Sequence, residues 1–183
     1  MIIKVRTDTI GFDIVPEHRS TSILNWIYYL ENDRVALFDK MHLHWFYATQ
    51  AEPESWSGDI FYMDRDVIER FRDGYAAYAI RHLDSIPPIN EFIENIDTYE
   101  TNDKENFDGY LDKITPVGSY TTVYNYDEAE DLRTMLETRY GKIIDPSIRN
   151  MHTDPHGDGE IFQTTRNQSI SDANLSIIRT RYS

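Results

Sequence analysis

The sequence has no cysteine among its 183 residues. This absence excludes a disulfide scaffold, a thiolate metal site and a cysteine nucleophile. The sequence also has no stretch approaching the roughly 20 apolar residues that span a membrane. Polar and charged residues within 1–15 interrupt the apolar stretch that a signal peptide requires. We therefore expect a cytoplasmic protein of the host cell, with no membrane contact.

Basic residues are also scarce. The chain has 18 Lys and Arg against 32 Asp and Glu, a net charge of −14 and a pI near 4.7. This balance argues against direct nucleic-acid binding, which needs a basic face. Residues 84–131 contain 13 of the acids and only Lys104 and Lys113, so this acidic block carries −11 of the charge.

Hydrophobic residues make up 40% of the chain and aromatic residues 13%, which is enough for a folded core. Alternating apolar residues predict short strands, at 2–7, 9–15, 35–38, 43–49, 60–63, 119–126 and 142–144. Apolar residues at helical spacing predict helices at 21–31, 65–84, 88–95 and 128–140. Asp64 is the expected N-cap of the second helix, and Gly141 the expected left-handed residue that ends the last.

The fold class that follows is α+β. We expect a single compact domain over 1–183, with about three to four helices and a mixed or antiparallel sheet of short strands. The polar segment 97–109 is expected to be a flexible loop. The segment 161–183 is expected to form a C-terminal hairpin or arm.

Two groups of residues have the chemistry of a catalytic or metal site. His42 and His44 lie two apart on an expected strand, so their rings share a face and are candidates for acid and base in a nuclease. Further candidates for the same chemistry are His152, His156 and Glu160. The alternative interpretation is a pair of half-buried histidines on a strand, because no third ligand is fixed by the spacing.

The second group is a Gly-rich loop whose side chains have the donor atoms of a metal site. Its candidate ligands are Asp154, His156, Asp158 and Glu160. The loop fails as a calcium-binding EF-hand, since His156 stands at its third position and Thr165 at its twelfth, where a bidentate Glu is required. An ordinary polar turn is the alternative. No nucleophile elbow, Walker A motif or dinucleotide-binding motif is present.

The acidic block differs from these groups because its acids are regularly spaced and interleaved with tyrosines. Carboxylates on one helix face lie roughly 5–6 Å apart, and duplex DNA carries a charge about every 1.7 Å along its axis. We therefore expect a surface that can occupy a basic groove built for phosphates, unless the block is only a solvated face. The candidate partner-binding residues are Glu91, Glu94, Asp97, Tyr99, Glu100, Asp103, Glu105, Asp108, Asp112, Glu128, Glu130 and Asp131.

These observations lead to one main functional hypothesis and two alternatives. The main one is an acidic inhibitor without cofactor, of phage or mobile-element type, that docks on a basic nucleic-acid-binding protein or ribonucleoprotein effector. Antirestriction and anti-CRISPR proteins are its analogues in size and composition. The alternatives are a small nuclease, using histidines or a divalent metal, and a non-enzymatic subunit of a phage or conjugative assembly. Arg166, Arg179 and Arg181 are expected to pair with the protein's own acids, a nucleic acid or a second subunit, which leaves a homodimer open.

The nuclease alternative has a direct test. It predicts that purified protein cleaves labelled RNA or DNA, and that His42→Ala/His44→Ala removes the cleavage because proton transfer is lost. Gel analysis with and without divalent ions or EDTA measures this. No cleavage under any condition, or equal cleavage by the variant, excludes the alternative.

Overall fold

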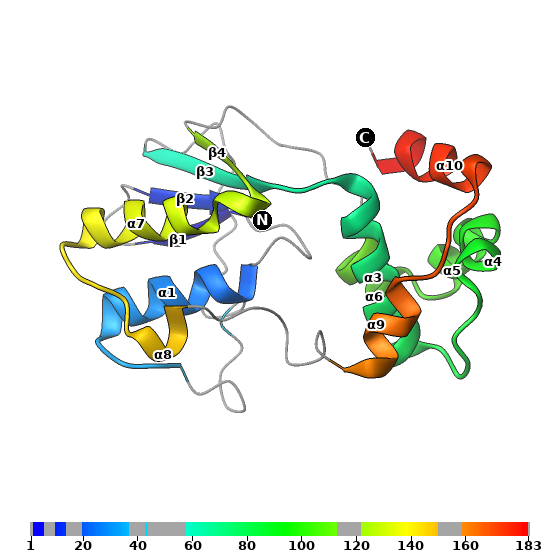
Figure 1. Cartoon of the computed structure of the whole chain (residues 1–183), viewed down its shortest axis with the longest axis horizontal. Coiled ribbons are helices and arrows are strands. Elements are labelled where there is room, and N and C mark those ends of the chain that lie inside the picture. The colour runs from blue at the N-terminus through cyan, green and yellow to red at the C-terminus, as the bar shows by residue number, and fades with distance from the viewer. Residues whose placement is uncertain are drawn as a thin grey trace. The chain divides into compact units, whose positions relative to one another are not determined.

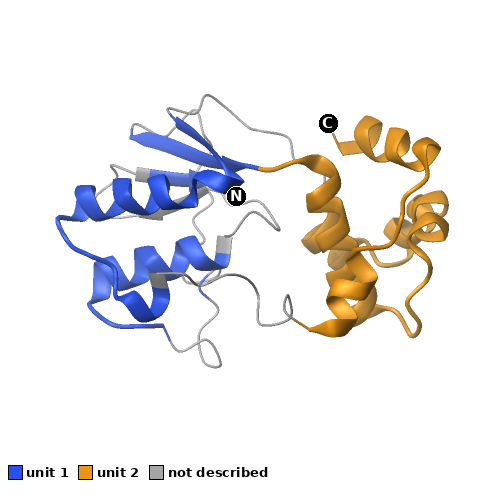
Figure 2. Cartoon of the chain, viewed as in Figure 1, with its two compact units in different colours: residues 1–64, 116–153 blue, residues 65–115, 154–183 orange. Residues whose placement is uncertain are grey.

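The structure is a computed structural model with two compact units, shown in Figure 2. Unit 1 comprises residues 1–64 and 116–153, and unit 2 comprises residues 65–115 and 154–183. The residues that the structure describes are 2–5, 10–13, 20–36, 43, 58–112, 122–149 and 159–182. Each unit has a hydrophobic core of its own, whereas the sequence analysis expects a single compact domain over 1–183.

Unit 1 contains a four-stranded sheet in the order β1-β2-β3-β4. The strands are β1 (Ile2–Val5), β2 (Ile10–Asp13), β3 (Asp59–Asp64) and β4 (Thr122–Asn125). β1 pairs antiparallel with β2, while β2 with β3 and β3 with β4 pair in parallel. The α+β class is therefore confirmed, and of the two predicted sheet types the antiparallel one is wrong.

Two helices cover one face of this sheet, α1 (Ser20–Asn32) and α7 (Ala129–Tyr140) (Figure 1). Phe12 of β2 stacks on Phe61 of β3 with ring centroids 4.9 Å apart, and both rings pack in the core with the apolar side chains of the two helices. The short 3-10 turn η2 (Tyr126–Glu128) leads into α7. The short helix α8 (Pro146–Arg149) is held by Trp26, whose Nε1 donates to the Ile148 carbonyl oxygen at 2.9 Å.

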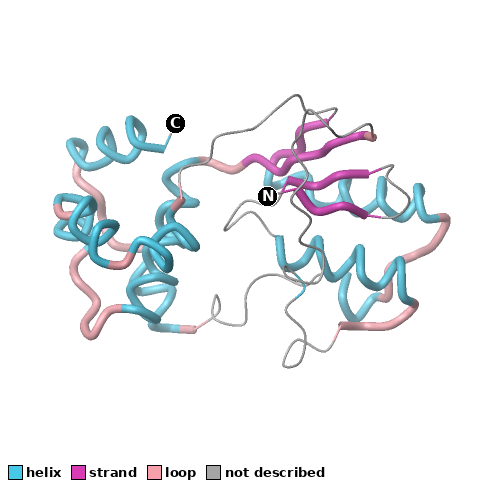
Figure 3. The backbone as a smooth tube through the Cα atoms, turned by 180° about the vertical axis from the view of Figure 1, so that it is seen from behind, coloured by secondary structure: helices cyan, strands magenta, loops and turns pink. Residues whose placement is uncertain are grey.

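The described residues of unit 2 form helices and short loops and contain no strand, as Figure 3 shows. Its helices are α3 (Val67–His82), α4 (Ile89–Glu94), α5 (Ile96–Asn102), α6 (Lys104–Leu111), α9 (Glu160–Arg166) and α10 (Asp172–Tyr182). α3 is the central helix and packs against α6, α9 and α10. No described helix of either unit is long and apolar enough to cross a membrane.

Several predicted elements are confirmed, and others are wrong. Helices at 21–31, 88–95 and 128–140 and strands at 60–63 and 119–126 are present with small shifts, and Gly141 ends α7 in the left-handed conformation with φ 63°. Asp66, not Asp64, caps α3, because its carboxylate accepts from the backbone N–H groups of Ile68 and Glu69. The expected strands at 35–38 and 43–49 fall almost wholly outside the described residues.

The largest errors concern three segments whose structure depends on distant contacts. Residues 97–109, expected to be a loop, form most of α5 and α6, because Phe107 is buried against other helices. The expected C-terminal hairpin consists instead of α9 and α10, and Ile178 and Tyr182 lie one helical turn apart on a buried face. Residues 142–144 form no strand. The described ranges hold nine α-helices, more than the three to four expected.

Gly74 explains how closely α3 and α6 approach one another. A β-carbon at this position would clash with the carbonyl oxygen of Tyr110 and lie 3.0 Å from Leu111 Cδ2. Gly109, on α6, has nothing within 4 Å of such a carbon. The two glycines therefore differ in environment although both lie within helices.

We predict opposite effects for alanine at these two positions. Gly74→Ala should lower the free energy of unfolding by about 1–3 kcal/mol, because the helices must separate to admit the methyl group. Gly109→Ala should raise it by about 0.5–1 kcal/mol, since alanine is the better helix former in open space. Urea unfolding followed by circular dichroism measures both, and a stabilising Gly74→Ala would contradict the packing described here.

Candidate protein-binding surface

The acidic block of the sequence is divided between the two units. The acids from Asp84 to Asp112 belong to unit 2, whereas those from Asp127 to Asp131 belong to unit 1. Each unit therefore has its own acidic face, and the face of unit 2 carries most of the predicted partner-binding residues.

Three short helices of unit 2, α4 to α6, position these carboxylates. Ile89, Phe92, Ile93 and Phe107 are buried in the core of the unit. Residues three and four apart share one face of a helix, so burial of these apolar residues leaves the intervening acids outside. The exposed acids on these helices are Glu91, Glu94, Asp97 and Glu105.

Aromatic packing fixes the helices relative to the core of unit 2. The Phe92 ring is stacked on Tyr99 with centroids 4.6 Å apart, and it also contacts the rings of Tyr75 and Tyr78 at 5.0 and 6.0 Å. Tyr99 was expected to be part of the partner-binding surface. In the structure it is half-buried, and its ring stacks on Phe92. The carboxylates are thus attached to a rigid support.

Several of the predicted acids form bonds within the unit. Arg181 pairs with Asp97 at 2.5 Å and also with Glu100. Lys104 lies 2.9 Å from Asp108 and 3.5 Å from Glu100. These pairs neutralise part of the negative charge of this face.

Asp103 has a different role, because it accepts a hydrogen bond from the Tyr78 hydroxyl at 3.3 Å. Burial, together with the charge of Asp103 and this hydrogen bond, raises the pKa of Tyr78 to about 12. Asp103 also accepts from Asn106 Nδ2 at 3.0 Å. This carboxylate therefore stabilises the junction between α5 and α6.

Other acids of unit 2 keep no partner among the described residues. Neither a cation nor a hydrogen-bond donor meets the side chains of Asp84, Glu91, Glu105 and Asp112 in that part of the chain. Glu94 accepts only from Asn174 Nδ2, at 3.3 Å. These five exposed carboxylates are the groups that an external cation can reach without displacing an internal one.

In unit 1, two acids of the acidic block form contacts near the start of α7. Glu128 accepts from the Asn125 backbone N–H at 2.7 Å and completes a capping box. Glu130 pairs with Arg133 at 2.5 Å. Asp127 and Asp131 are exposed and lack partners among the described residues.

The three C-terminal arginines have different roles. Arg166 pairs with Asp73 and, at 2.7 Å, with Glu69, and Arg181 pairs with acids of α5 as described above. Burial acts to lower the pKa of Arg166, but the two carboxylates outweigh it and the pKa is raised. These two side chains thus pair with the protein's own acids, while Arg179 is exposed and meets no acid in the described part of the chain.

The predicted histidine and metal sites fall almost entirely outside the described residues. This applies to His42, His44, His152, Asp154, His156 and Asp158. Glu160 is described and lies exposed in the first turn of α9. The described ranges contain no group of three metal-ligating side chains, so neither site gains support and both stay predictions.

One feature that the sequence did not reveal is a hollow beside the loop between α3 and α4. Its lining consists of Leu83, Asp84, Ser85, Ile86, Pro87, Pro88, Glu91 and Tyr99. Two of the unpartnered carboxylates, Asp84 and Glu91, therefore meet at one place with apolar and aromatic groups. The clustered prolines were the only sequence signal, and they predicted a helix end rather than a site.

Comparison with known proteins adds no relative. No protein-family model, no curated protein and no solved structure matches this chain. The geometry of the described residues is therefore the basis for any functional conclusion.

Tyr182 provides a test of the core beneath this surface. Burial raises its pKa to about 12, although the nearby charges of Arg181 and Arg70 oppose the shift. In the unfolded chain a tyrosine ionises near pH 10. Because the folded-state pKa is raised, its contribution to stability is complete below pH 10 and is lost as the pH rises towards 12.

We predict that the free energy of unfolding of the wild type falls between pH 10 and 12 by roughly 2 kcal/mol more than that of Tyr182→Phe. The phenylalanine keeps the buried ring but has no hydroxyl to ionise. Urea unfolding at a series of pH values measures the two slopes. Parallel slopes would show that Tyr182 is not buried as described.

Proposed function

We propose that this protein is a non-enzymatic binding protein of phage or mobile-element type. In this proposal, the acidic face of unit 2 enters the basic groove of a nucleic-acid-handling effector and blocks it. The observation that supports this most is a set of exposed carboxylates on α4, on α6 and in the chain next to them, which no cation among the described residues neutralises. Its members are Asp84, Glu91, Glu94, Glu105 and Asp112, and of these only Glu94 has a hydrogen-bond partner in the described part of the chain, Asn174.

The charge balance of unit 2 favours such a partner. Its described residues include 14 acids against eight arginines and lysines, so the unit stays negative after every internal ion pair is formed. Like charges gathered on one surface repel one another, and a basic partner relieves that repulsion. A neutral or acidic partner offers no such gain.

The helices that carry these acids are held rigidly by the core of unit 2, and this rigidity favours tight binding of a partner. The acids of α4 and α5 stand on helices locked by the Phe92 cluster, so little conformational entropy is lost when a partner binds. A basic groove that is filled by carboxylates releases its counterions, as it does when it is filled by phosphates. Binding by this mechanism weakens steeply with added salt.

The proposal predicts that the protein displaces nucleic acid from its target. Titration into complexes of labelled duplex DNA or guide RNA with candidate restriction and RNA-guided effectors should release the label from at least one of them. Raising the salt from 50 to 200 mM should weaken the competition by at least about tenfold, because several ion pairs are screened. Fluorescence anisotropy measures the release.

A pair of charge-matched variants tests which unit binds. Glu91→Gln/Glu105→Gln in unit 2 should weaken displacement by at least about fivefold, and Asp127→Asn/Asp131→Asn in unit 1 should change it by less than about twofold. All four carboxylates are exposed and lack partners in the described part of the chain, so folding is preserved in both variants. Release from no effector at any salt, or equal loss in both variants, would refute the proposal.

A further inference from the structure

The hollow beside the α3–α4 loop combines three kinds of surface in one place. Leu83, Ile86 and the two prolines supply apolar groups, and the Ile86 side chain is 40% exposed. Tyr99 is the aromatic residue of the lining, and it is half-buried with its ring stacked on Phe92. Asp84 and Glu91 supply carboxylates that no cation among the described residues neutralises.

The loop that forms this hollow is held in place by a chain of hydrogen bonds. The buried Tyr75 donates its hydroxyl to the Pro87 carbonyl oxygen at 2.5 Å and accepts from Gln168 Nε2 at 3.1 Å. Gln168 in turn accepts from the Ile89 backbone N–H at 3.1 Å through its Oε1. Pro87 and Pro88 restrict the backbone further, since each ring fixes its own φ. The hollow is therefore formed before any partner arrives.

Its chemistry selects one class of occupant. A phosphate or carboxylate group is repelled by the two acids, and a purely apolar side chain would bury them without a partner. A guanidinium group suits all three kinds of surface in the hollow. It is planar, donates paired hydrogen bonds to carboxylates and packs favourably against aromatic rings. Its aliphatic stem can lie along Ile86 and the prolines.

We propose that this hollow is the anchor site for an arginine side chain of the basic partner. The inference rests on the proposed function, since it names the contact that would dominate that interface. Interfaces concentrate their binding energy in a few anchors that fill pockets, and arginine is among the residues most often found there. The remaining acids of unit 2 then attract the partner without fixing its position.

Binding of short peptides to the full-length protein tests the anchor. The probes are capped hexa-arginine and hexa-lysine peptides, which have equal charge and differ in the guanidinium group. We expect wild-type protein to bind hexa-arginine at least about fivefold more tightly than hexa-lysine, because lysine cannot make the paired, stacked contact. Isothermal titration calorimetry at fixed salt measures both affinities.

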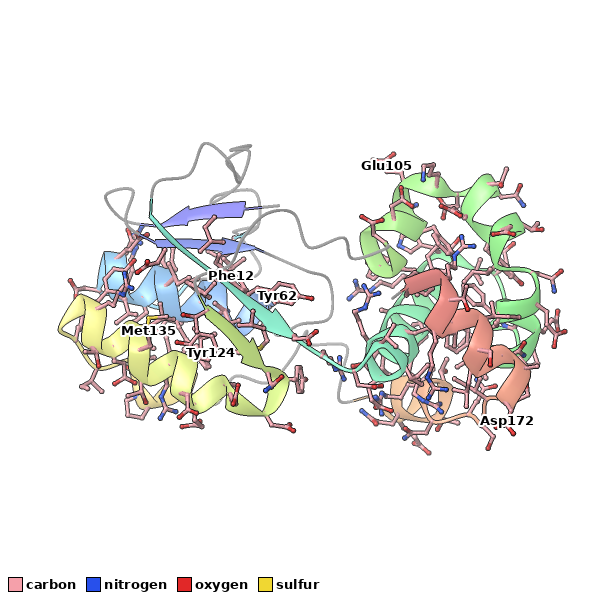
Figure 4. All side chains as sticks on the ribbon, turned by 90° about the horizontal axis from the view of Figure 1, so that it is seen from above. Phe12, Tyr62, Glu105, Tyr124, Met135 and Asp172 are labelled. Carbon is pink, nitrogen blue, oxygen red and sulfur yellow. The ribbon has the colours of Figure 1, made fainter. Side chains whose placement is uncertain are left out.

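Two double variants separate the hollow from the general charge. Asp84→Asn/Glu91→Gln should weaken hexa-arginine binding by about tenfold and remove the preference over hexa-lysine. Glu105→Gln/Asp172→Asn removes the same charge from α6 and α10, outside the lining of the hollow, and should weaken binding by less than about threefold. Figure 4 labels these two control positions.

The outcomes distinguish this inference from the proposed function. Equal losses in the two variants, or no preference for hexa-arginine in the wild type, would overturn the anchor and leave a diffuse acidic face able to displace nucleic acid. A preference that depends on Asp84 and Glu91, without displacement from any effector, would support the anchor and refute the inhibitory function. Circular dichroism of each variant confirms that its helix content is unchanged.

Discussion

The packing of Phe92 against its aromatic neighbours is the contact on which the rest of unit 2 depends. Its ring meets those of Tyr75, Tyr78, Tyr99 and Phe107, so one side chain connects α3 with α4, α5 and α6. Large aromatic rings bury much apolar surface, and their mutual contacts add to that gain. The helices α4 and α5 are too short to persist alone, and this cluster stabilises them.

The electrostatics of unit 2 follow from that packing. Once the helices are fixed, the carboxylates divide into those that arginine and lysine side chains of the unit can reach and those that they cannot. Asp97 and Glu100 belong to the first group through Arg181, and Glu91 and Glu105 to the second. Net charge alone does not describe this division, because a paired carboxylate and a free carboxylate contribute equally to the net charge. Only the free carboxylate attracts a basic partner at full strength.

Sequence patterns predicted the elements with strong local signals and missed those that tertiary contacts create. The helix α1 and the strand β3 have dense apolar patterns, and both are present. In α5 and α6, by contrast, single apolar residues stand among polar ones, and Phe107 finds its neighbours only through distant contacts. The role of Gly74 in α3 also depends on a distant contact, since the Tyr110 carbonyl oxygen that packs against it is 36 positions away.

The sequence by itself determined the acidic character, the absence of thiol chemistry and the α+β class, because composition and periodicity are properties of the chain alone. Only the tertiary structure decided that each unit has a core of its own and that the acidic block is shared between two units. It also decided which acids are neutralised and that Asp84 and Glu91 share a hollow with Tyr99. The reason is physical: ion pairs and hollows depend on distances between residues far apart in the chain, and the chain fixes these distances only when it folds.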